Sequence, residues 1–542
     1  MPRHPFLLLL LLPLLCTHNT AADDDQPHNR FLQCLDSENS AAADSISKLI
    51  YTDTNPSYSS VLQFSIRNPR FNTTTTLKPL LIVTPRNISH IQATIKCSAK
   101  HGLQLRVRSG GHDYEGLSYA SLLPNVQFIV LDMINFQDVA VDVASKTAWV
   151  QAGATLGQLY YAIAQKSSTL AFPAGVCPTV GAGGYFSGGG YGTMQRKHGL
   201  AADNVVDAVF IDAKGRTLGR SSMGEDMFWA VRGGGGNTFG VAVAWKVKLV
   251  AVPEKVTVFR VRRTLEQNAT KIVHRWQTVA NELPQDIIIM ATIQKVNSTS
   301  TAQLTTTIQA TFNALFLGGA EGVLKLVGDK FPELGLVKED CTEMSWIEST
   351  VHFARFPANT PPAILLNRTI TLLTGSAKYK GKSDYVQKPI LETVWEGVWK
   401  KLDELGPLAG ALVMIPYGGK MAEIPASSLP FPHRAGNLFM IQYDVFWNED
   451  GAEAEERHVD WIREMYSYMT PYVSQNPRGA YMNYRDLDIG MNAVEGKTSY
   501  REARVWGVKY FKSNFDRLVR VKTAVDPENV FRNEQSIPPF SV

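Results

Sequence analysis

The sequence lacks the motifs of several common enzyme classes. It contains no G-x-G-x-x-G fingerprint, no H-E-x-x-H, no cysteine pair at zinc spacing and no G-x-S-x-G nucleophile elbow. Two segments that end in Lys382-Ser383 and Lys497-Thr498 imitate a P-loop, but in each the upstream glycine lies one residue too far away. These absences argue against a Rossmann-type nucleotide site, a P-loop, a zinc hydrolase and an α/β-hydrolase.

Blocks of one charge and apolar runs of membrane length are also absent. The 54 basic and 50 acidic residues are interspersed, and the net charge is +4, so we expect no nucleic-acid partner. The apolar run Phe6 to Leu15 is shorter than the roughly 18 to 20 residues that span a bilayer. Basic residues precede this run and small residues follow it up to Ala22, which predicts a signal peptide over residues 1–22. We therefore expect a soluble, exported protein with no membrane partner.

Cysteine is scarce, with five residues in a chain of 542. Cys16 leaves with the signal peptide, and the remaining four predict two disulfides with three possible pairings. We expect the first to join Cys34 to Cys97, because that bond ties the N-terminal segment to the first folded unit. Cys341 is expected to be a small buried apolar residue. Cys177 lies in a glycine-rich loop and is left without an obvious partner.

Glycosylation acceptors support the secretory route. Five N-x-S/T sites predict a glycoprotein, with each site on an exposed loop or turn: Asn72, Asn87, Asn268, Asn297 and Asn367. The predicted destination is the extracellular space or cell wall, or the vacuole.

Residues 79 to about 253 alternate short β-rich runs with helical stretches. LIVTP (81–85) predicts a strand, and residues 88–102 predict a helix that ends at Gly102. The segment LQLRVRSG (103–110) alternates apolar and polar residues with the period of a half-buried strand. Further predicted strands are FIVLDM, TAWVQAG, NVVDAVFID and VAVAWKVKLVAV. The pattern predicts an α+β unit.

The sequence pattern changes after about residue 253. Long runs such as IIIMATIQKV and LTTTIQATFNALFLG alternate with helical segments such as ILETVWEGVWKKLDEL, which predicts a second α+β unit with a large antiparallel sheet. After residue 476, a helix is predicted over YFKSNFDRLVRVKTAVDP, followed by the tail NVFRNEQSIPP. We expect this compact segment to dock on a domain.

Three glycine-rich loops follow strands of the first unit. They are RSGGHDYEG, GVCPTVGAGGYFSGGGYG and RGGGGNTFG. Successive backbone N–H groups without side chains can form a concave site for anionic groups. Three such loops in one unit favour a large cofactor that carries phosphate.

Four segments, RVRSGGHDYEGLSY, PAGVCPTVGAGGYFSGGGYG, NYRDLDIG and NVFRNEQSIPP, resemble the berberine bridge enzyme-like flavoproteins of plants. The resemblance extends from about Cys34 to Pro539. It implies an α+β fold of the vanillyl-alcohol-oxidase (PCMH) type. An FAD-binding domain of two α+β subdomains would span residues 23–252, and a substrate domain with a helix-covered antiparallel sheet would span 253–475. Residues 476–542 would complete the FAD domain, and we expect a monomer.

The resemblance also implies that FAD is attached by two covalent bonds. His112 would bond the 8α carbon of the flavin, and Cys177 would bond ring carbon 6, which would explain why Cys177 has no cysteine partner. The loops expected to line the flavin or its diphosphate contain Ser109, Gly110, Gly111, Gly181, Ala182 and Gly183.

Alcohol oxidation requires a base for the hydroxyl proton. By resemblance this base is Tyr484, while Tyr191 and Tyr114 neighbour the substrate and Gln442 hydrogen-bonds it. A phenol has a pKa of about 10 and must be acidified to act as a base. Some family members use a lysine two residues before the glutamine, but this chain has Met440 there. Another cation or the flavin would then have to stabilise the phenolate.

Two further positions bear on the reaction. Cannabinoid-cyclising relatives have histidine where this chain has Thr292 and glutamate where it has Met440, so that activity is not expected. Val180 resembles the members that admit dioxygen, which predicts an oxidase that forms hydrogen peroxide. The substrate would be a hydroxyl-bearing carbohydrate or a phenolic or alkaloid metabolite. The alternatives are a flavin-containing cyclase and a catalytically silent secreted glycoprotein.

Overall fold

The computed structural model describes residues 27–39, 45–235, 237–298, 305–370, 377–493 and 498–540. The predicted signal peptide and Cys16 lie outside these ranges. No helix within them combines the length and the apolar character that a membrane crossing needs. The domain divisions at residues 252 and 475 stay predictions.

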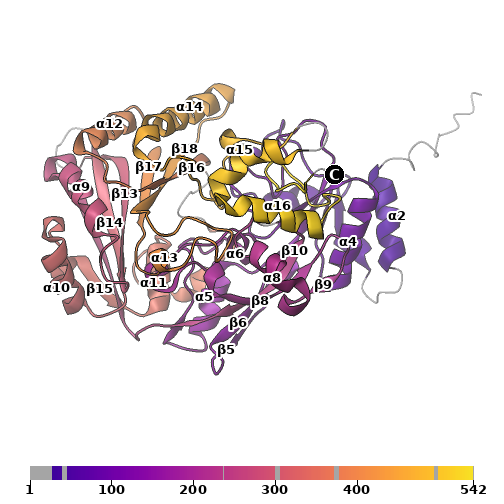
Figure 1. Cartoon of the computed structure of the whole chain (residues 1–542), viewed down its shortest axis with the longest axis horizontal. Helices are drawn as coiled ribbons and strands as arrows, with labels where there is room; N and C mark the ends of the chain where they lie inside the picture. Colours follow the sequence, from indigo (N-terminus) through magenta and orange to yellow (C-terminus); the bar gives the residue numbers. More distant parts are fainter. Residues whose placement is uncertain are drawn as a thin grey trace, which may run out of the picture.

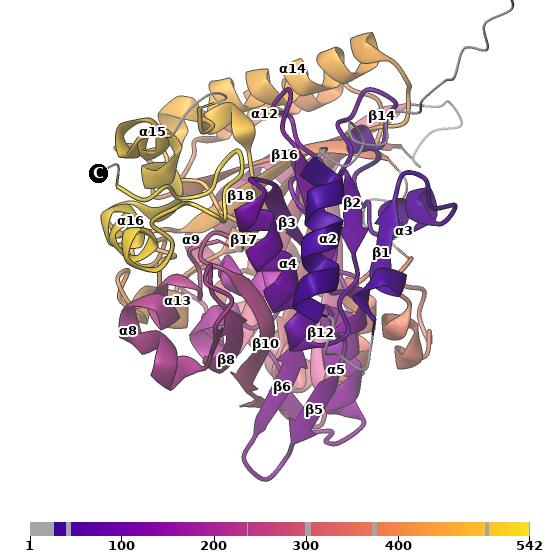
Figure 2. The ribbon, with the colours of Figure 1, turned by 90° about the vertical axis from the view of Figure 1, so that its right-hand side faces the viewer.

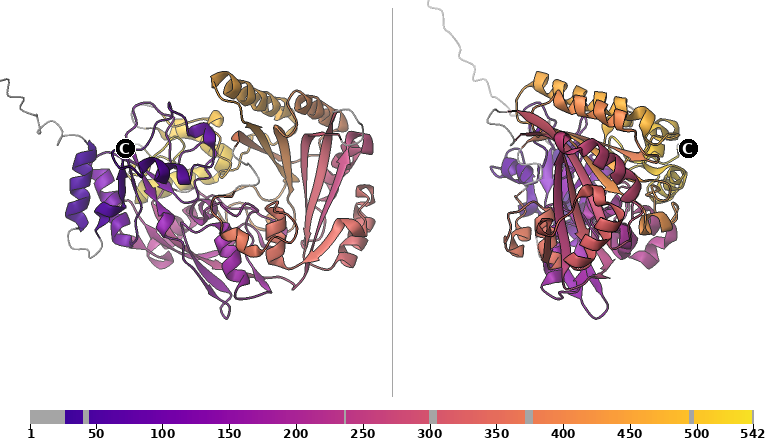
Figure 3. Two further views of the ribbon diagram at one scale, coloured as in Figure 1. Left: turned by 180° about the vertical axis from the view of Figure 1, so that it is seen from behind. Right: turned by 90° about the vertical axis from the view of Figure 1, so that its left-hand side faces the viewer.

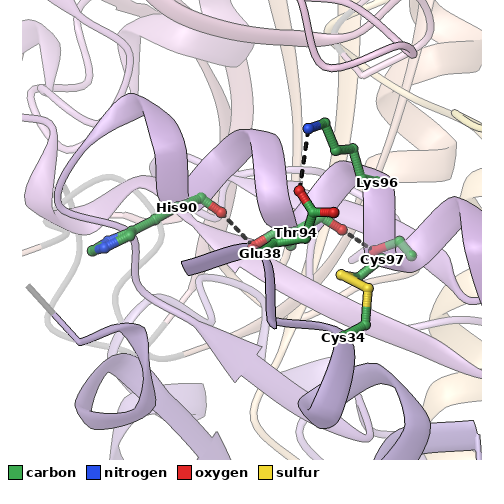
Figure 4. The surroundings of a disulfide bond; sticks show 7 residues. Cys34, Glu38, His90, Thr94, Lys96 and Cys97 are labelled. Atoms are coloured by element: carbon green, nitrogen blue, oxygen red, sulfur yellow. Dashed lines mark hydrogen bonds and ion pairs between the residues drawn. A yellow bond between two sulfur atoms is a disulfide. The ribbon is translucent and has the colours of Figure 1, made fainter. Parts of the chain in front are cut away.

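The first sheet has four strands in the order β1-β2-β4-β3, with β2 and β3 parallel to β4. Helices α2 and α4 lie together over one face of it (Figure 2). The predicted disulfide between Cys34 and Cys97 is confirmed and joins these two helices, and an ion pair between Lys96 and Glu38 lies beside it (Figure 4). The elements are α2 (Pro27–Asn39), β1 (Ile50–Thr52), α3 (Tyr58–Phe64), β2 (Leu81–Val83), α4 (Ile88–Lys100), β3 (Gln104–Arg108) and β4 (Phe128–Asp132).

The second sheet has five antiparallel strands in the order β5-β6-β10-β8-β9. β7 and β11 pair with each other as a separate two-stranded sheet. The elements of this region are β5 (Val139–Asp142), β6 (Thr147–Gln151), α5 (Leu156–Ala164), β7 (Leu170–Ala171), α6 (Ala182–Ser187), α7 (Gln195–His198), β8 (Val205–Ile211), β9 (Thr217–Leu218), α8 (Arg220–Ala230), β10 (Val241–Lys248) and β11 (Val250–Ala251). The glycine-rich segment of residues 173–192 connects β7 to α7 and contains the short helix α6.

Strand β3 is buried on both faces, unlike the half-buried strand that the alternation predicts. Arg106 and Arg108 are both fully buried. Arg106 pairs with Glu534 at 2.7 Å and Arg108 pairs with Asp132 at 2.6 Å. A buried charge is tolerated only when it is paired. Arg106 therefore holds the C-terminal segment onto the first sheet, and Arg108 joins β3 to the end of β4.

The third sheet has seven antiparallel strands in the order β15-β12-β14-β13-β17-β18-β16. Helices α9, α10, α12 and α14 cover its outer face, and the opposite face looks toward the other two sheets (Figures 1 and 3). The elements are β12 (Val256–Thr264), α9 (Ala269–Val279), β13 (Ile287–Asn297), β14 (Thr306–Phe316), α10 (Ala320–Lys330), β15 (Cys341–Met344), α11 (Trp346–Phe353), β16 (Lys378–Val386), α12 (Glu392–Asp403), β17 (Gly410–Pro416), α13 (Lys420–Glu423), β18 (Phe439–Trp447) and α14 (Ala452–Met469).

The C-terminal segment contains two helices where the sequence predicts one. They are α15 (Tyr500–Phe511) and α16 (Asn514–Val525). Lys512 has a φ of +47°, which ends α15 and reverses the chain. The reversal packs Phe515 of α16 against Trp506 of α15, with ring centroids 5.9 Å apart. Aromatic contact between the two helices thus favours the break over one continuous helix.

The structure differs from the expectation of exposed loop positions at two of the five glycosylation acceptors. Asn87 is half-buried because its side chain caps α4 by accepting a hydrogen bond from the backbone N–H of His90. Asn297 is the last residue of β13 rather than a loop residue, although it is exposed, as are the other three acceptor asparagines. Cys341 is half-buried at the start of β15, where it packs against the apolar residues beneath the seven-stranded sheet.

Candidate active site

A cavity of about 1160 Å³ lies between the first two sheets and the inner face of the seven-stranded sheet. It reaches from Phe210 of β8 to Trp447 of β18. This volume exceeds the roughly 300 to 1,000 Å³ of most small-molecule sites, so it can hold a large cofactor together with a substrate. Four buried polar atoms of its lining have no hydrogen-bond partner among the described residues: Ser118 Oγ, Asn237 Oδ1, Trp447 Nε1 and Arg485 Nη1. Such atoms are expected to bind a polar ligand.

Two glycine loops meet backbone to backbone at one end of the cavity. A Cβ atom on Gly110 would lie 2.4 Å from the backbone nitrogen of Gly181, and one on Gly181 would lie 2.0 Å from Ser109 Oγ. Gly111 has a φ of +71°, and a Cβ there would lie 1.7 Å from the backbone oxygen of Ser65. Only glycine permits this approach. The contact brings residue 112 of one loop and residue 177 of the other to the same end of the cavity.

The Thr179 hydroxyl lies between the side chains of His112 and Cys177. His112 Nε2 is 2.9 Å from Thr179 Oγ1, and Cys177 Sγ is 3.6 Å from the same oxygen. Burial, and next the Arg67 guanidinium, lower the pKa of His112 to about 3, so the imidazole is neutral. Burial raises the pKa of the Cys177 thiol, and the Thr179 hydroxyl and Arg67 oppose that rise. Nothing in the sequence singled out Thr179.

Tyrosine rings form the neighbouring part of the lining. Tyr114 stacks on Tyr484 with ring centroids 5.1 Å apart, and Tyr191 meets Tyr484 edge to face at 5.7 Å. Burial raises the pKa of Tyr484 above its usual value. Met440 is 1% exposed and supplies no charge. The described residues therefore do not bring the pKa of the Tyr484 phenol below its usual value, although its predicted role as a base requires a lower pKa.

Gln442 is held from two sides. Its Nε2 donates one hydrogen bond to the Tyr114 hydroxyl and one to Asp444 Oδ1, each 3.0 Å long. Both hydrogens of the amide nitrogen are thus used within the protein. The carbonyl oxygen of Gln442 is left as the group that can accept a hydrogen bond from a substrate hydroxyl.

Sequence reasoning missed two charged residues of the cavity, Asp444 and Arg355. The Asp444 side chain is buried, and burial raises its pKa to about 7, while the Gln442 hydrogen bond and the charge of Arg355 oppose that rise. Strand alternation could have found Asp444, because it lies two residues after Gln442 on β18 and so shares its face. No local signal marks Arg355, which has a φ of +64° and follows α11.

The structure brings together all but one of the predicted site residues. The cavity lining contains Ser109, Gly110, Gly111, His112, Tyr114, Cys177, Val180, Gly181, Gly183, Tyr191, Gln442 and Tyr484, together with Thr292. Ala182 is the exception, since it is fully buried in the core and its N–H donates to the backbone oxygen of Ala154. The predicted role of each lining residue is treated below as a proposal.

Comparison with known proteins places these features in context. Residues 79–219 match the FAD binding domain family, and residues 480–538 match the family described as berberine and berberine like. Berberine bridge enzyme-like 8 of Arabidopsis thaliana is 51% identical over 511 residues, which are 94% of each chain. Tetrahydroberberine oxidase of Berberis wilsoniae is 47% identical over 537 residues, 99% of this chain and 97% of that one.

A solved structure has the same fold. Wild-type Phl p 4.0202, a grass pollen allergen described as a glucose dehydrogenase, matches with a TM-score of 0.87 and 46% identity. The match covers 94% of this chain and 100% of that one. A variant of Phl p 4 in which valine replaces an isoleucine is described as a glucose oxidase, and it matches with a TM-score of 0.86.

Proposed function

The chain belongs to the berberine bridge enzyme-like family of FAD-linked oxidoreductases, and we propose that it is a secreted oxidase of hydroxyl-bearing carbohydrates or of phenolic or alkaloid metabolites. The observation that carries the proposal is the arrangement of the cavity. Neutral His112 and Cys177 stand at the cofactor end, and Gln442 and Asp444 face the same space from the seven-stranded sheet. The confirmed disulfide and the exposed acceptor asparagines support the secretory route.

The cavity is large enough for FAD, and its lining contains four buried polar atoms without a hydrogen-bond partner among the described residues. When bound, it supplies the hydride acceptor and the electron carrier to dioxygen. We propose covalent attachment through His112 and Cys177, with the glycine loops of Ser109–Gly111 and Gly181–Gly183 against the cofactor. A double attachment retains the cofactor without enclosing it, so the substrate end of the cavity can stay open.

We propose that the Asp444 carboxylate is the base that removes the proton of the substrate hydroxyl. A general base works best when its pKa lies near the operating pH, and the pKa of Asp444 is about 7. Tyr484 as the base stays a prediction, because burial favours its neutral form. In this assignment the Gln442 carbonyl oxygen and the Tyr484 hydroxyl bind the substrate, and the Asp444 carboxylate takes its proton.

Dioxygen is the proposed electron acceptor. Val180 lines the cavity three residues after Cys177. The Phl p 4 variant described as an oxidase has valine in place of an isoleucine of the dehydrogenase. This agrees with the proposal that a smaller side chain admits dioxygen. We therefore expect one molecule of hydrogen peroxide for each molecule of substrate oxidised.

The test is an oxygen-electrode assay of the purified protein on a panel of sugars, including glucose, and of tetrahydroberberine-type alkaloids. Equal amounts of oxygen consumed, hydrogen peroxide formed and product formed support the oxidase. Product without oxygen consumption would indicate a cyclase instead. Acid denaturation of the same preparation tests the attachment, because covalently bound flavin stays with the polypeptide and flavin held by other forces is released.

Asp444→Asn tests the assignment of the base. We expect kcat/KM to fall by about 10²- to 10⁴-fold, the usual contribution of a general base, with the flavin content unchanged. Wild-type activity should rise with pH around pH 7 as Asp444 loses its proton, and the activity of the variant should not show this rise. Asp329→Asn, on the exposed side of α10, is the matched control and should change nothing. An unchanged pH profile in Asp444→Asn would refute the assignment.

A further inference from the structure

We propose that Thr179 is the positioning residue for both covalent bonds to the flavin. Its hydroxyl accepts a hydrogen bond from His112 Nε2–H and donates one to Cys177 Sγ. It thereby selects the imidazole nitrogen that attacks and stabilises the sulfur as a thiolate. The inference rests on the double attachment proposed above.

The geometry supports one assignment of the two protons. Thr179 is 1% exposed, so no bulk water competes for its hydroxyl, and its oxygen lies 2.9 Å from His112 Nε2 and 3.6 Å from Cys177 Sγ. A hydroxyl has a single hydrogen to donate. If that hydrogen went to His112, the sulfur would receive none. With Nε2–H as the donor, the hydroxyl serves both partners at once, and His112 Nδ1 keeps the lone pair that can form a bond to carbon.

The surrounding charges favour both nucleophiles. Neutral imidazole is the reactive form of His112, and burial together with Arg67 keeps it neutral. Thiolate is the reactive form of Cys177, and burial opposes it while Thr179 and Arg67 favour it. Arg67 is itself held by hydrogen bonds from its guanidinium to the backbone oxygens of Gly110, at 3.4 Å, and Arg368, at 2.5 Å.

The other titratable groups near the sulfur carry no charge. Burial raises the pKa of each phenol that acts electrostatically on Cys177, so each stays neutral: Tyr114, Tyr160, Tyr379 and Tyr484. Besides backbone hydrogen bonds from Thr179 and Val180, the thiolate is therefore favoured by one cation, Arg67, and one hydroxyl, that of Thr179. Of these two, only the hydroxyl also contacts His112 directly.

The chemistry balances with dioxygen as the oxidant. Each attachment breaks one C–H bond of the flavin and removes one hydrogen from His112 or Cys177, and it forms one C–N or C–S bond. The two hydrogens leave as two protons and two electrons, and one dioxygen accepts them to give hydrogen peroxide. The proposed function supplies this oxidant at the same site.

Thr179→Val and Thr179→Ser separate the hydroxyl from the shape of the side chain. The full chain is secreted from a eukaryotic host, denatured in acid and digested, and flavin is quantified by mass on the peptides of His112 and Cys177. We expect both attachments in the wild type and in Thr179→Ser. In Thr179→Val the Cys177 attachment at pH 7 should fall about ten-fold or more, because a hydrogen bond to a charged group is lost. The flavin on His112 should be on Nδ1 in the wild type.

Incubation of Thr179→Val in air at pH 9 provides the second readout. Higher pH restores the thiolate without the hydroxyl, so the Cys177 attachment should recover, which a merely structural defect would not do. Both attachments at wild-type level in Thr179→Val at pH 7, no recovery at pH 9, loss of both in Thr179→Ser, or flavin on His112 Nε2 would each overturn the inference. If Thr179→Val is not secreted, Thr179→Ala carries the same expectations. A wild type without covalent flavin would instead refute the double attachment itself.

Discussion

The two walls of the cavity are built in different ways. The anchoring wall, residues 109–112 and 175–183, consists of backbone packed against backbone, so that a single added carbon has no room. The sheet wall, the cavity-facing residues of β13, β17 and β18, consists of alternate side chains on regular strands. On β13, Ile289 and Ile293 face the covering helices while Met290 and Thr292 face the cavity. The cofactor end is therefore fixed by the main chain, and the substrate end can change without altering the fold.

Gly181→Ala should break the anchoring wall and gives the largest expected effect. The new Cβ would overlap Ser109 Oγ and the backbone nitrogen of Gly110, and neither loop has space to move away. We expect a loss of about 3 kcal/mol or more in the free energy of unfolding, together with a loss of bound flavin. Secretion yield, the melting temperature and the flavin absorbance per chain measure this.

The control for that substitution is Gly328→Ala in helix α10, where a Cβ would meet nothing within 4 Å. Alanine favours a helix over glycine by about 1 kcal/mol, so this variant should be neutral or slightly stabilised. Normal flavin content in Gly181→Ala would show that the two loops are not fixed by their backbone contact.

A buried cluster of charges joins β16, the neighbour of β18, to the segments that follow His112 and Tyr484. Lys380 of β16 contacts Glu115, which follows the His112 loop. It also pairs with Asp486, which follows Tyr484, at a nitrogen–oxygen distance of 2.9 Å. Lys382 pairs with the same Asp486 at 2.7 Å. All four side chains are at most 3% exposed. The cluster therefore fixes the Tyr484 segment relative to the anchoring wall.

Lys380→Met should remove the close cation partner of Glu115, while Asp486 keeps Lys382. The excess of buried negative charge should cost about 3 to 5 kcal/mol in unfolding free energy. Chemical denaturation monitored by flavin and by tryptophan fluorescence measures this loss. Arg457→Met removes an exposed ion pair with Glu449 and serves as the control, for which we expect a change of less than about 1 kcal/mol. Equal losses in unfolding free energy in the two variants would mean that the buried cluster stabilises the fold no more than an exposed ion pair does.

The sequence predicted the anchoring wall better than the sheet wall, for a physical reason. His112 and Cys177 lie in short motifs whose glycines are needed for local backbone contact, so the constraint is visible locally. Arg106 looked like a solvent-facing residue of β3, because its partner Glu534 is 428 residues away in sequence. Arg355 was missed because no local pattern marks it, whereas the alternation of β18 from Gln442 could have indicated Asp444. Tyr484 as a base came from resemblance alone and stays a prediction.

Asp444 tests the sheet wall through the pH dependence of stability. Burial raises its pKa to about 7 in the folded protein, whereas an unfolded aspartate has a pKa of about 3.9. Between these pH values the folded state binds more protons than the unfolded state, so the free energy of unfolding falls as the pH rises from about 4 to about 7. The total change is on the order of 4 kcal/mol, because each pKa unit corresponds to about 1.4 kcal/mol.

Asp444→Asn carries no titrating group, so its stability should lack this pH dependence. The variant should therefore gain stability relative to the wild type as the pH rises, and the difference should level off above about pH 7. Melting temperatures of both proteins between pH 4 and pH 8 measure the difference, with Asp329→Asn again as the exposed control. Parallel curves would mean that Asp444 is solvated in the folded protein. The sheet wall would then be an open surface, and the contrast with the closely packed anchoring wall would rest on the glycine loops alone.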